Sequence, residues 1–424
     1  MPPLSATCPF CGLLCDDLVV ESQGDSLRPL KGACARSQAA FARLGTPAAA
    51  RTGARVAGRP ATLEAALDAA AELLHRRRRP LIAGLGADVG GMRATLALAR
   101  RLGAVVDHGG SGTKYRNLHV LQEFGWITTT LAEVRNRADV LLLIGDGWHA
   151  RFPRLIERAM APESDLYGAR APRRAILLGE AAAAASAALP QSVERLIVGT
   201  PMARLPALIG MLCAQASSQP VDPARLGGVA AQTLAQCVDW LRTARYGVAV
   251  WAAADLDFPH AELALQALSR LLRALNVEHR FAGLPLAGSN ADLTANAVHT
   301  WQSGVSFPAS HANGRVDFDP HRYAAPRVLA RGEADCLVWI SSLSDDPLPA
   351  FDGPTIVFGR TDLQLAREPA VFLPVATPGI DADGHLLRTD KVVSLYLRRL
   401  RTSALPSVAE AVEALVQRLE SRTH

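Results

Sequence analysis

From residue 52 onward, segments with helical periodicity alternate with short runs of aliphatic residues. Residues 62–75 begin with a threonine and repeat leucine and alanine on one face, which predicts a helix with Thr62 as its N-cap. The apolar run at 80–86 predicts a buried strand. The same alternation predicts further helices at 92–102, 131–138, 223–242, 259–275 and 407–418. It predicts further strands at 104–106, 139–145, 175–178, 195–198, 247–251, 277–281, 336–341 and 355–358.

Strands that alternate with helices predict parallel sheets covered on both faces, so the fold class is α/β, of the doubly wound type. In such sheets, ligand sites lie outside the carboxyl ends of the strands. Candidate functional residues are therefore sought directly after the predicted strands rather than before them.

Composition narrows the class of protein. The 424 residues are 49% hydrophobic, 20% charged and 5% aromatic, which excludes a disordered chain and suggests two to three domains. The net charge of +5 is too small for a dedicated nucleic-acid binder of this length. No apolar run approaches the roughly 20 residues of a membrane span. The start of the chain shows no export signal. We therefore expect a cytoplasmic protein with no membrane or nucleic-acid partner.

Common catalytic motifs are absent. Gly84, Gly86 and Gly90 follow a predicted strand, but the third glycine comes one residue too late for a dinucleotide-binding loop, so a tight strand-to-helix turn is the better interpretation. The chain has no phosphate-binding G-x-x-x-x-G-K-[ST] loop, no H-E-x-x-H and no G-x-S-x-G. Its eleven histidines are scattered. A free-standing nucleotide-dependent or zinc-hydrolase activity in this chain is disfavoured.

Four cysteines crowd the first 34 residues: Cys8, Cys11, Cys15 and Cys34 follow the spacing C-x2-C-x3-C-x18-C. In a reducing compartment such a set is more often a metal site than a pair of disulfides. Four thiolates suit a [4Fe–4S] cluster or tetrahedral zinc. Three close ligands and one remote ligand favour the cluster. Zinc and an empty site remain the alternatives.

This cysteine segment resembles the opening of a known family, the B subunit of formylmethanofuran dehydrogenase, a branch of the tungsten/molybdenum bis-pterin oxidoreductases. The bacterial relatives of that family are the B subunits of formyltransferase/hydrolase complexes. The resemblance extends over nearly the whole chain through short blocks in the expected order. These blocks are 8–17, 31–34, 103–107, 130–139, 300–304, 331–335 and 379–384.

The resemblance implies a particular domain layout. Residues 1–50 would form a four-cysteine domain. Residues 51–107 together with 281–400 would form a first α/β domain, interleaved with a second at 108–280. A C-terminal helix would occupy 401–424. A further pterin-binding domain would lie on a separate small subunit.

The same resemblance exposes departures at the redox centre. Aligned without gaps, Thr113 and Lys114 stand where the archaeal relatives have a metal-ligating cysteine followed by histidine, and a threonine hydroxyl replaces a soft thiolate poorly. A second, gapped alignment would make Asp107 an oxygen ligand. The pterin-contacting segment is also degenerate. Relatives read G-x-N-P where this chain has Gly145, Asp146, Gly147 and Trp148, so the amide and the proline are lost.

Two interpretations follow. In the favoured one, the chain is a redox-inactive scaffold that has lost its tungsto- or molybdopterin. It serves a one-carbon pathway of methylotrophs, in which a formyl group on a methanofuran-like or tetrahydromethanopterin carrier becomes formate. Its partners would then be a zinc-dependent hydrolase subunit, a formyltransferase subunit and a small pterin-domain-like subunit. In the alternative, the chain is an active tungsten- or molybdenum-pterin, iron–sulfur subunit.

Overall fold

The protein is represented by a computed structural model that describes residues 2–45, 53–109, 111–164, 166, 172–222, 228–343 and 345–422. The residues form two compact units. Unit 1 comprises Met1–Gly112, Gly288–Arg388 and Val393–His424, and unit 2 comprises Thr113–Ala287 and Thr389–Val392. Unit 1 thus ends at residue 112 and resumes at residue 288, a few residues later than the domain boundaries at 107 and 281 that the sequence predicts. The segments 1–50 and 401–424 both fall within unit 1.

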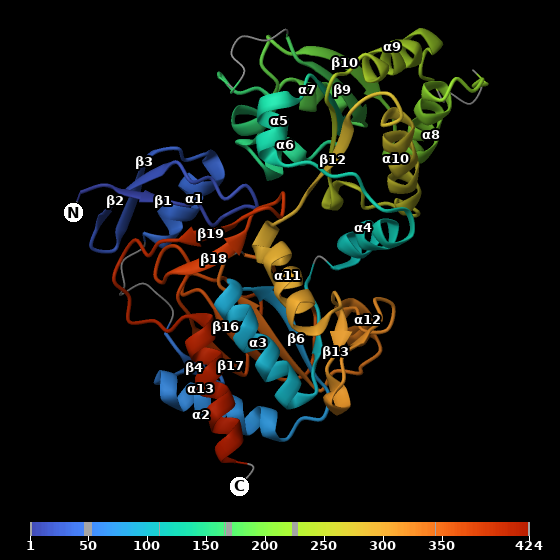
Figure 1. Ribbon diagram of the computed structural model, residues 1–424. Coiled ribbons are helices and arrows are strands. Elements are labelled where there is room, and N and C mark those ends of the chain that lie inside the picture. The colour runs from blue at the N-terminus through green and yellow to red at the C-terminus, as the bar shows by residue number, and fades with distance from the viewer. Residues whose placement is uncertain are drawn as a thin grey trace. The chain divides into compact units, whose positions relative to one another are not determined.

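Unit 1 is built on a mixed sheet with the strand order β14-β13-β7-β6-β15-β16-β17-β4-β5 among the described residues (Figure 1). The five inner strands, from β7 to β17, are parallel, and short antiparallel strands finish both edges. The strands are β4 Arg55–Val56, β5 Arg59–Pro60, β6 Pro80–Gly86, β7 Val105–Val106, β13 Ala309–Ser310, β14 Asp317–Phe318, β15 Cys336–Ser341, β16 Thr355–Gly359 and β17 Val371–Pro374.

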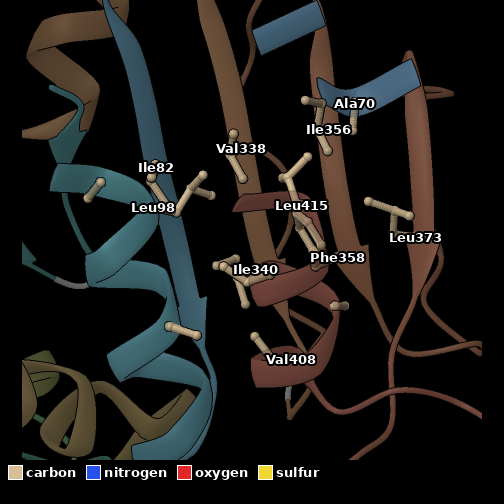
Figure 2. Packing of buried hydrophobic residues seen from close by; sticks show 14 of the residues in the cluster. Ala70, Ile82, Leu98, Val338, Ile340, Ile356, Phe358, Leu373, Val408 and Leu415 are labelled. Atoms are coloured by element: carbon tan, nitrogen blue, oxygen red, sulfur yellow. The ribbon is translucent and has the colours of Figure 1, made fainter. Parts of the chain in front are cut away.

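Alternate residues of these strands fill two separate cores. On one face, residues such as Ile82, Val338 and Phe358 pack against helices, as Figure 2 shows. On the other face, residues such as Leu81 and Trp339 pack under α12. The helices that contribute to the first core are α2 Leu63–His75, α3 Val89–Leu102, α11 Asp292–Ser303 and α13 Val408–Ser421, and α12 is Ala325–Ala330. The C-terminal helix therefore closes the core of unit 1 and is not an appendage.

The N-terminal part of unit 1 carries its own antiparallel sheet, β1-β2-β3, with strands Leu4–Ala6, Leu18–Gln23 and Ser26–Lys31. The helix α1, Ala35–Leu44, follows it, and its Phe41 meets Phe10 edge to face at 5.3 Å between ring centroids. The remaining elements of unit 1 are the hairpin β18 Gly384–Leu387 and β19 Ser394–Leu397, and the helix α11 Asp292–Ser303.

Unit 2 is a fully parallel sheet with the order β10-β9-β8-β11-β12. The inner residues of β8, such as Leu142, pack against α8, α9 and α10. The strands are β8 Val140–Ile144, β9 Arg174–Gly179, β10 Glu194–Gly199, β11 Gly247–Ala252 and β12 Phe281–Leu286. The helices are α4 Ser111–Phe124, α5 Leu131–Arg137, α6 Trp148–Arg151, α7 Ala182–Ser186, α8 Leu205–Ala216, α9 Ala231–Arg242 and α10 Glu262–Leu275.

These elements confirm the α/β class with parallel sheets. Thr62 accepts a hydrogen bond from Ala65 N at 3.1 Å and caps α2 as expected. The strand predicted at 277–281 is wrong in position, since β12 begins at Phe281 and Val277 is 82% exposed. Part of the helix predicted at 223–242 lies outside the described residues, and α9 covers the rest. No helix in the described parts of the chain has the length and apolarity needed to cross a membrane.

A buried histidine pair makes unit 1 sensitive to acid. His299 on α11 and His311 after β13 approach each other through their Nε2 atoms at 3.2 Å, and the Nδ1–H of His299 donates to the carbonyl of Val305 at 2.7 Å. Burial, the charge of His299 and the charge of Arg100 lower the pKa of His311 to about 4. Burial and the charge of Arg100 also lower the pKa of His299. Both rings are therefore neutral in the folded state at neutral pH.

We expect the free energy of unfolding to fall as the pH drops from about 6.5 toward 4, because only the unfolded chain takes up these protons in that range. The His311 contribution alone is about 2 kcal/mol between pH 7.5 and pH 5. Urea unfolding at the two pH values measures it. The variant His311→Gln should lose less stability on acidification, whereas His260→Gln, at a side chain 77% exposed, should behave as wild type. An equal acid loss in all three proteins would contradict this assignment.

Candidate functional site

The four N-terminal cysteines are gathered near one another in unit 1. Cys8, Cys11 and Cys15 are buried, Cys34 is half-buried, and all four are free thiols. Burial raises the pKa of Cys8 well above its ordinary value, and the charges of Cys11, Cys15 and Cys34 raise it further. Each of the other three sulfurs is therefore close enough to Cys8 for a direct electrostatic interaction. The structure thus brings the predicted set into one region.

Backbone N–H groups point at two of these sulfurs. The N–H of Phe10 next to Cys8, and those of Leu13 and Leu14 next to Cys11, lower the pKa of the two thiols against the effect of burial. The positive charge of Arg36 acts on Cys11 in the same direction. Such N–H···S bonds stabilise metal-bound thiolates. Thiol sulfur is a common metal ligand, so the donor types fit a metal centre. In the described residues, however, no group of three or more His, Cys, Asp or Glu side chains is placed to hold a metal ion.

The loop between Cys11 and Cys15 is fixed by close backbone packing. Cys8 N donates to Cys15 O at 2.8 Å, and Leu14 adopts a left-handed conformation with φ 46°. Gly12 lies directly against Gly288, where a Cβ would come within 2.6 Å of the Gly12 Cα. Only glycine fits at 288, whose φ of +98° also excludes most side chains. The cysteine loop is thus held against the start of the segment that leads into α11.

The degenerate segment predicted from the sequence lies at the carboxyl edge of the unit 2 sheet, directly after β8. There the carboxylate of Asp255, which follows β11, accepts hydrogen bonds from Gly147 N at 2.9 Å and from Arg151 Nε at 2.8 Å. The Asp255 side chain is only 4% exposed. A Cβ on Gly147 would clash with Asp255 Oδ1, so the asparagine of the G-x-N-P pattern does not fit here without moving Asp255.

The two neighbours of Gly147 reinforce this arrangement. Asp146 accepts a hydrogen bond from Ala181 N at 2.9 Å, and its other carboxylate oxygen is buried against Gly179 without a hydrogen-bond partner in the described residues. Trp148 begins the short helix α6 and is completely buried. Two carboxylates, those of Asp146 and Asp255, thus accept backbone N–H groups at this edge, and Asp255 is also paired with Arg151.

The predicted redox-ligand positions lie in the first turn of α4. Thr113 and Lys114 are both half-buried there. The alternative ligand Asp107 is fully buried and engaged elsewhere. It accepts hydrogen bonds from His108 N at 2.8 Å, Ser111 Oγ at 3.0 Å and Ala325 N at 2.6 Å. Asp107 thus caps α12 and holds the loop before α4, which argues against its role as a metal ligand.

The carboxyl edge of the unit 1 sheet is also occupied by side chains. Arg360, which follows β16 and is buried, pairs with Asp362 at 2.9 Å and with Asp345. Asp345 also pairs with Arg43 on α1 at 2.9 Å. These pairs link the cysteine-bearing segment to the sheet edge and raise the pKa of Arg360 despite its burial. At this edge, Arg360 and Arg43 thus share the carboxylate of Asp345.

The expected turn after β6 adopts the predicted geometry. β6 ends at Gly86 and α3 begins at Val89, with Asp88 as its N-cap. The Asp88 carboxylate accepts from Gly91 N at 2.9 Å and Gly90 N at 3.3 Å. These N–H groups, which a dinucleotide phosphate would require, are therefore already occupied by a carboxylate.

Comparison with known proteins decides the family. Over 373 residues the chain is 30% identical to the B subunit of the formyltransferase/hydrolase complex of Methylorubrum extorquens, a match that covers 87% of this chain and 97% of the relative. The chain belongs to the family of formyltransferase/hydrolase B subunits. No protein-family model matches it.

The wider relatives place this B-subunit family beside the tungsten enzymes. The B subunits of the tungsten-containing formylmethanofuran dehydrogenases 2 of Methanococcus maripaludis and Methanocaldococcus jannaschii are 23% and 24% identical over 432 and 415 residues. Those matches cover 98% and 93% of this chain and the same shares of the relatives. The crystal structure of the Methylorubrum extorquens formyltransferase/hydrolase complex with methylofuran contains a chain similar to this one. It matches with a TM-score of 0.74 and 28% identity, covering 88% of this chain and 99% of that one.

The structure also identifies residues that sequence reasoning missed in this B subunit. Asp255 and Arg360 each stand shortly after a predicted strand, which is where the carboxyl edge of a sheet places functional groups. This position directly after a strand is the signal from which sequence reasoning could have found Asp255 and Arg360. Their partners are up to 108 residues distant in the sequence, so the contacts themselves leave no local pattern.

Proposed function

We propose that this chain is the B subunit of a formyltransferase/hydrolase complex in one-carbon metabolism, and that it acts as a redox-inactive scaffold. The complex would transfer a formyl group between a tetrahydromethanopterin-type and a methanofuran-like carrier and release it as formate. The chemistry would reside on partner subunits, namely a zinc-dependent hydrolase and a formyltransferase. A small pterin-domain-like subunit would complete the assembly.

The observation that carries the redox-inactive role is the position of Asp255. In the family that the chain resembles, the segment at 145–148 contacts an anionic pterin. Here the N–H of Gly147 is already bound by the Asp255 carboxylate, and Asp146 adds a second negative charge. Opposite charge and free N–H donors are what a phosphate-bearing cofactor requires. Here the Gly147 N–H is taken up by Asp255, and Arg151 is paired with the same carboxylate, which supports loss of the tungsto- or molybdopterin.

The four cysteines are proposed to form a cluster-type site within a small N-terminal domain, followed by two interleaved α/β domains. Buried thiols with N–H···S bonds and an adjacent arginine support a site for Cys8, Cys11, Cys15 and Cys34. A [4Fe–4S] cluster, when bound, would supply one-electron chemistry; zinc would supply structure only. Iron, sulfide and zinc analysis of anaerobically purified protein distinguishes these occupants.

The alternative function, an active tungsten- or molybdenum-pterin subunit, is favoured by one observation. The complete cysteine set of an electron-transfer site is present, and a cluster has no evident task without a redox centre. The substitutions at Thr113 and Lys114 and the carboxylates at 146 and 255 weigh against it.

The assembly is tested by purifying the chain through an affinity tag from its native source and by expressing it alone. We expect the native preparation to contain hydrolase and formyltransferase subunits and to release formate from a formylated carrier. The chain expressed alone should release none, because it carries no convincing hydrolytic constellation. A lone chain that hydrolyses or oxidises the formyl substrate would contradict the scaffold role.

A further inference from the structure

Unit 1 contains a cavity of about 550 Å³ at the amino-terminal edge of β6 and β7. Arg78 and Arg79, directly before β6, form one wall. Residues 310–323, around β13 and β14, form another. Ligands of parallel sheets normally bind at the opposite, carboxyl edge. The residues that line the cavity include neither the segment at 145–148 nor any of the four N-terminal cysteines.

The cavity concentrates positive charge. Its lining residues include four arginines, Arg78, Arg79, Arg315 and Arg322, and a single acidic residue, Asp317. Asp317 is engaged by the hydroxyl of Tyr323 at 2.6 Å. Arg79 pairs with Glu333 at 3.0 Å, whereas the other three arginines form no salt bridge with any described residue. Asp319, outside the lining, also interacts with the charge of Arg322, so the residues that line the hollow carry a net positive charge that nearby carboxylates reduce.

Backbone contacts hold these arginines at the cavity. The carboxylate of Asp335 accepts hydrogen bonds from Arg78 N at 2.7 Å and Arg79 N at 3.1 Å, which fixes the backbone of the two residues before β6. Arg322 lies over the ring of Tyr323 at 5.3 Å from its centroid. Cation–π contact limits the directions in which that guanidinium points. Three chain segments that are distant in sequence therefore present arginines to one hollow.

We propose that this arginine cavity binds a small polyanion, a molecule with two or more phosphate or carboxylate groups. A guanidinium binds either group through paired N–H···O bonds, and a hollow lined by one sign of charge concentrates counter-charged ligands. The volume lies within the roughly 300–1,000 Å³ of small-molecule sites. This binding does not depend on the redox state of the complex, so its test is independent of the proposed function.

Isothermal titration of the purified chain with pyrophosphate and, separately, with citrate at about 50 mM salt tests the proposal. We expect binding of at least one ligand, weakened about tenfold by Arg315→Gln and by Arg322→Gln, since each removes a charge-assisted contact. Both arginines are exposed, so the fold and melting temperature should not change. Arg398→Gln, an exposed arginine outside the cavity, is the matched control and should bind as wild type.

Comparing the two ligands distinguishes a site for phosphate groups from a site for carboxylate groups. Binding of pyrophosphate alone would assign a phosphate-bearing ligand, and binding of citrate alone would assign a polycarboxylate. Raising the salt should weaken either interaction, because the site is partly open to solvent. The proposal is overturned if neither ligand binds below about 1 mM. It is equally overturned if the cavity variants bind as tightly as wild type.

Discussion

Replacing Trp148 with alanine is expected to lower the free energy of unfolding by about 3–5 kcal/mol. Trp148 is completely buried at the start of α6, directly after the degenerate pterin segment. Removing the indole leaves a cavity next to the Asp255 and Arg151 contacts that fix this edge. Because Trp148 is completely buried at this edge of the unit 2 sheet, the stability of the edge should depend on its packing.

Urea unfolding measures this effect, and Trp301→Ala provides the matched control. Trp301 is 62% exposed on α11, so the same truncation should change stability by no more than about 0.5 kcal/mol. A small loss in both variants would mean that residues 145–148 form an open, loosely packed segment. In that case the edge would still have room for a cofactor.

Replacing Arg401 with leucine is expected to lower the free energy of unfolding by about 3–5 kcal/mol. Arg401 donates to Asp381 at 2.7 Å, and both side chains are almost fully buried, at 3% and 4% exposure. Arg401 also donates to the carbonyls of Asp25 at 3.0 Å and Leu44 at 2.6 Å. The leucine variant leaves a buried carboxylate without its cation and two carbonyls without their donor.

This change should also loosen the cysteine segment, because Asp25 and Leu44 flank β3 and α1. We expect a thiol reagent to modify Cys8, Cys11 and Cys15 faster in Arg401→Leu than in wild type. Arg398→Leu, three positions away and exposed, is the control for charge removal alone. The double variant Arg401→Leu with Asp381→Asn should recover part of the stability, since no buried charge is then unpaired. Equal stability of Arg401→Leu and Arg398→Leu would contradict this role.

Much of the fold was predictable because its strands follow simple local rules. The runs at 80–86 and 336–341 are predominantly apolar and form β6 and β15 with the predicted bounds. Strand β12 was misplaced because Phe281–Leu286 contains glycine and proline, which have low strand propensity. The helix α4 was not predicted, since its polar sequence from Ser111 shows little amphipathic periodicity.

The candidate site was predictable only where it leaves a local pattern. The cysteine spacing and the segment at 145–148 stand in the sequence as short motifs, and the second follows strand β8 of the parallel sheet in unit 2. The pairing of Asp255 with Gly147 and of Arg401 with Asp381 depends on tertiary contacts across 108 and 20 residues. No periodicity or motif encodes such contacts, so they emerge only from the folded chain.

We infer above all that this chain has kept the α/β fold of its family but lost the pterin redox centre. The most direct measurement is the tungsten and molybdenum content of the complex purified through this chain, with formyl hydrolysis and formate-dependent dye reduction assayed on the same sample. We expect release of formate from the formylated carrier, no bound tungsten or molybdenum, and no dye reduction. Stoichiometric tungsten or molybdenum together with formate-dependent dye reduction would contradict the loss of the centre.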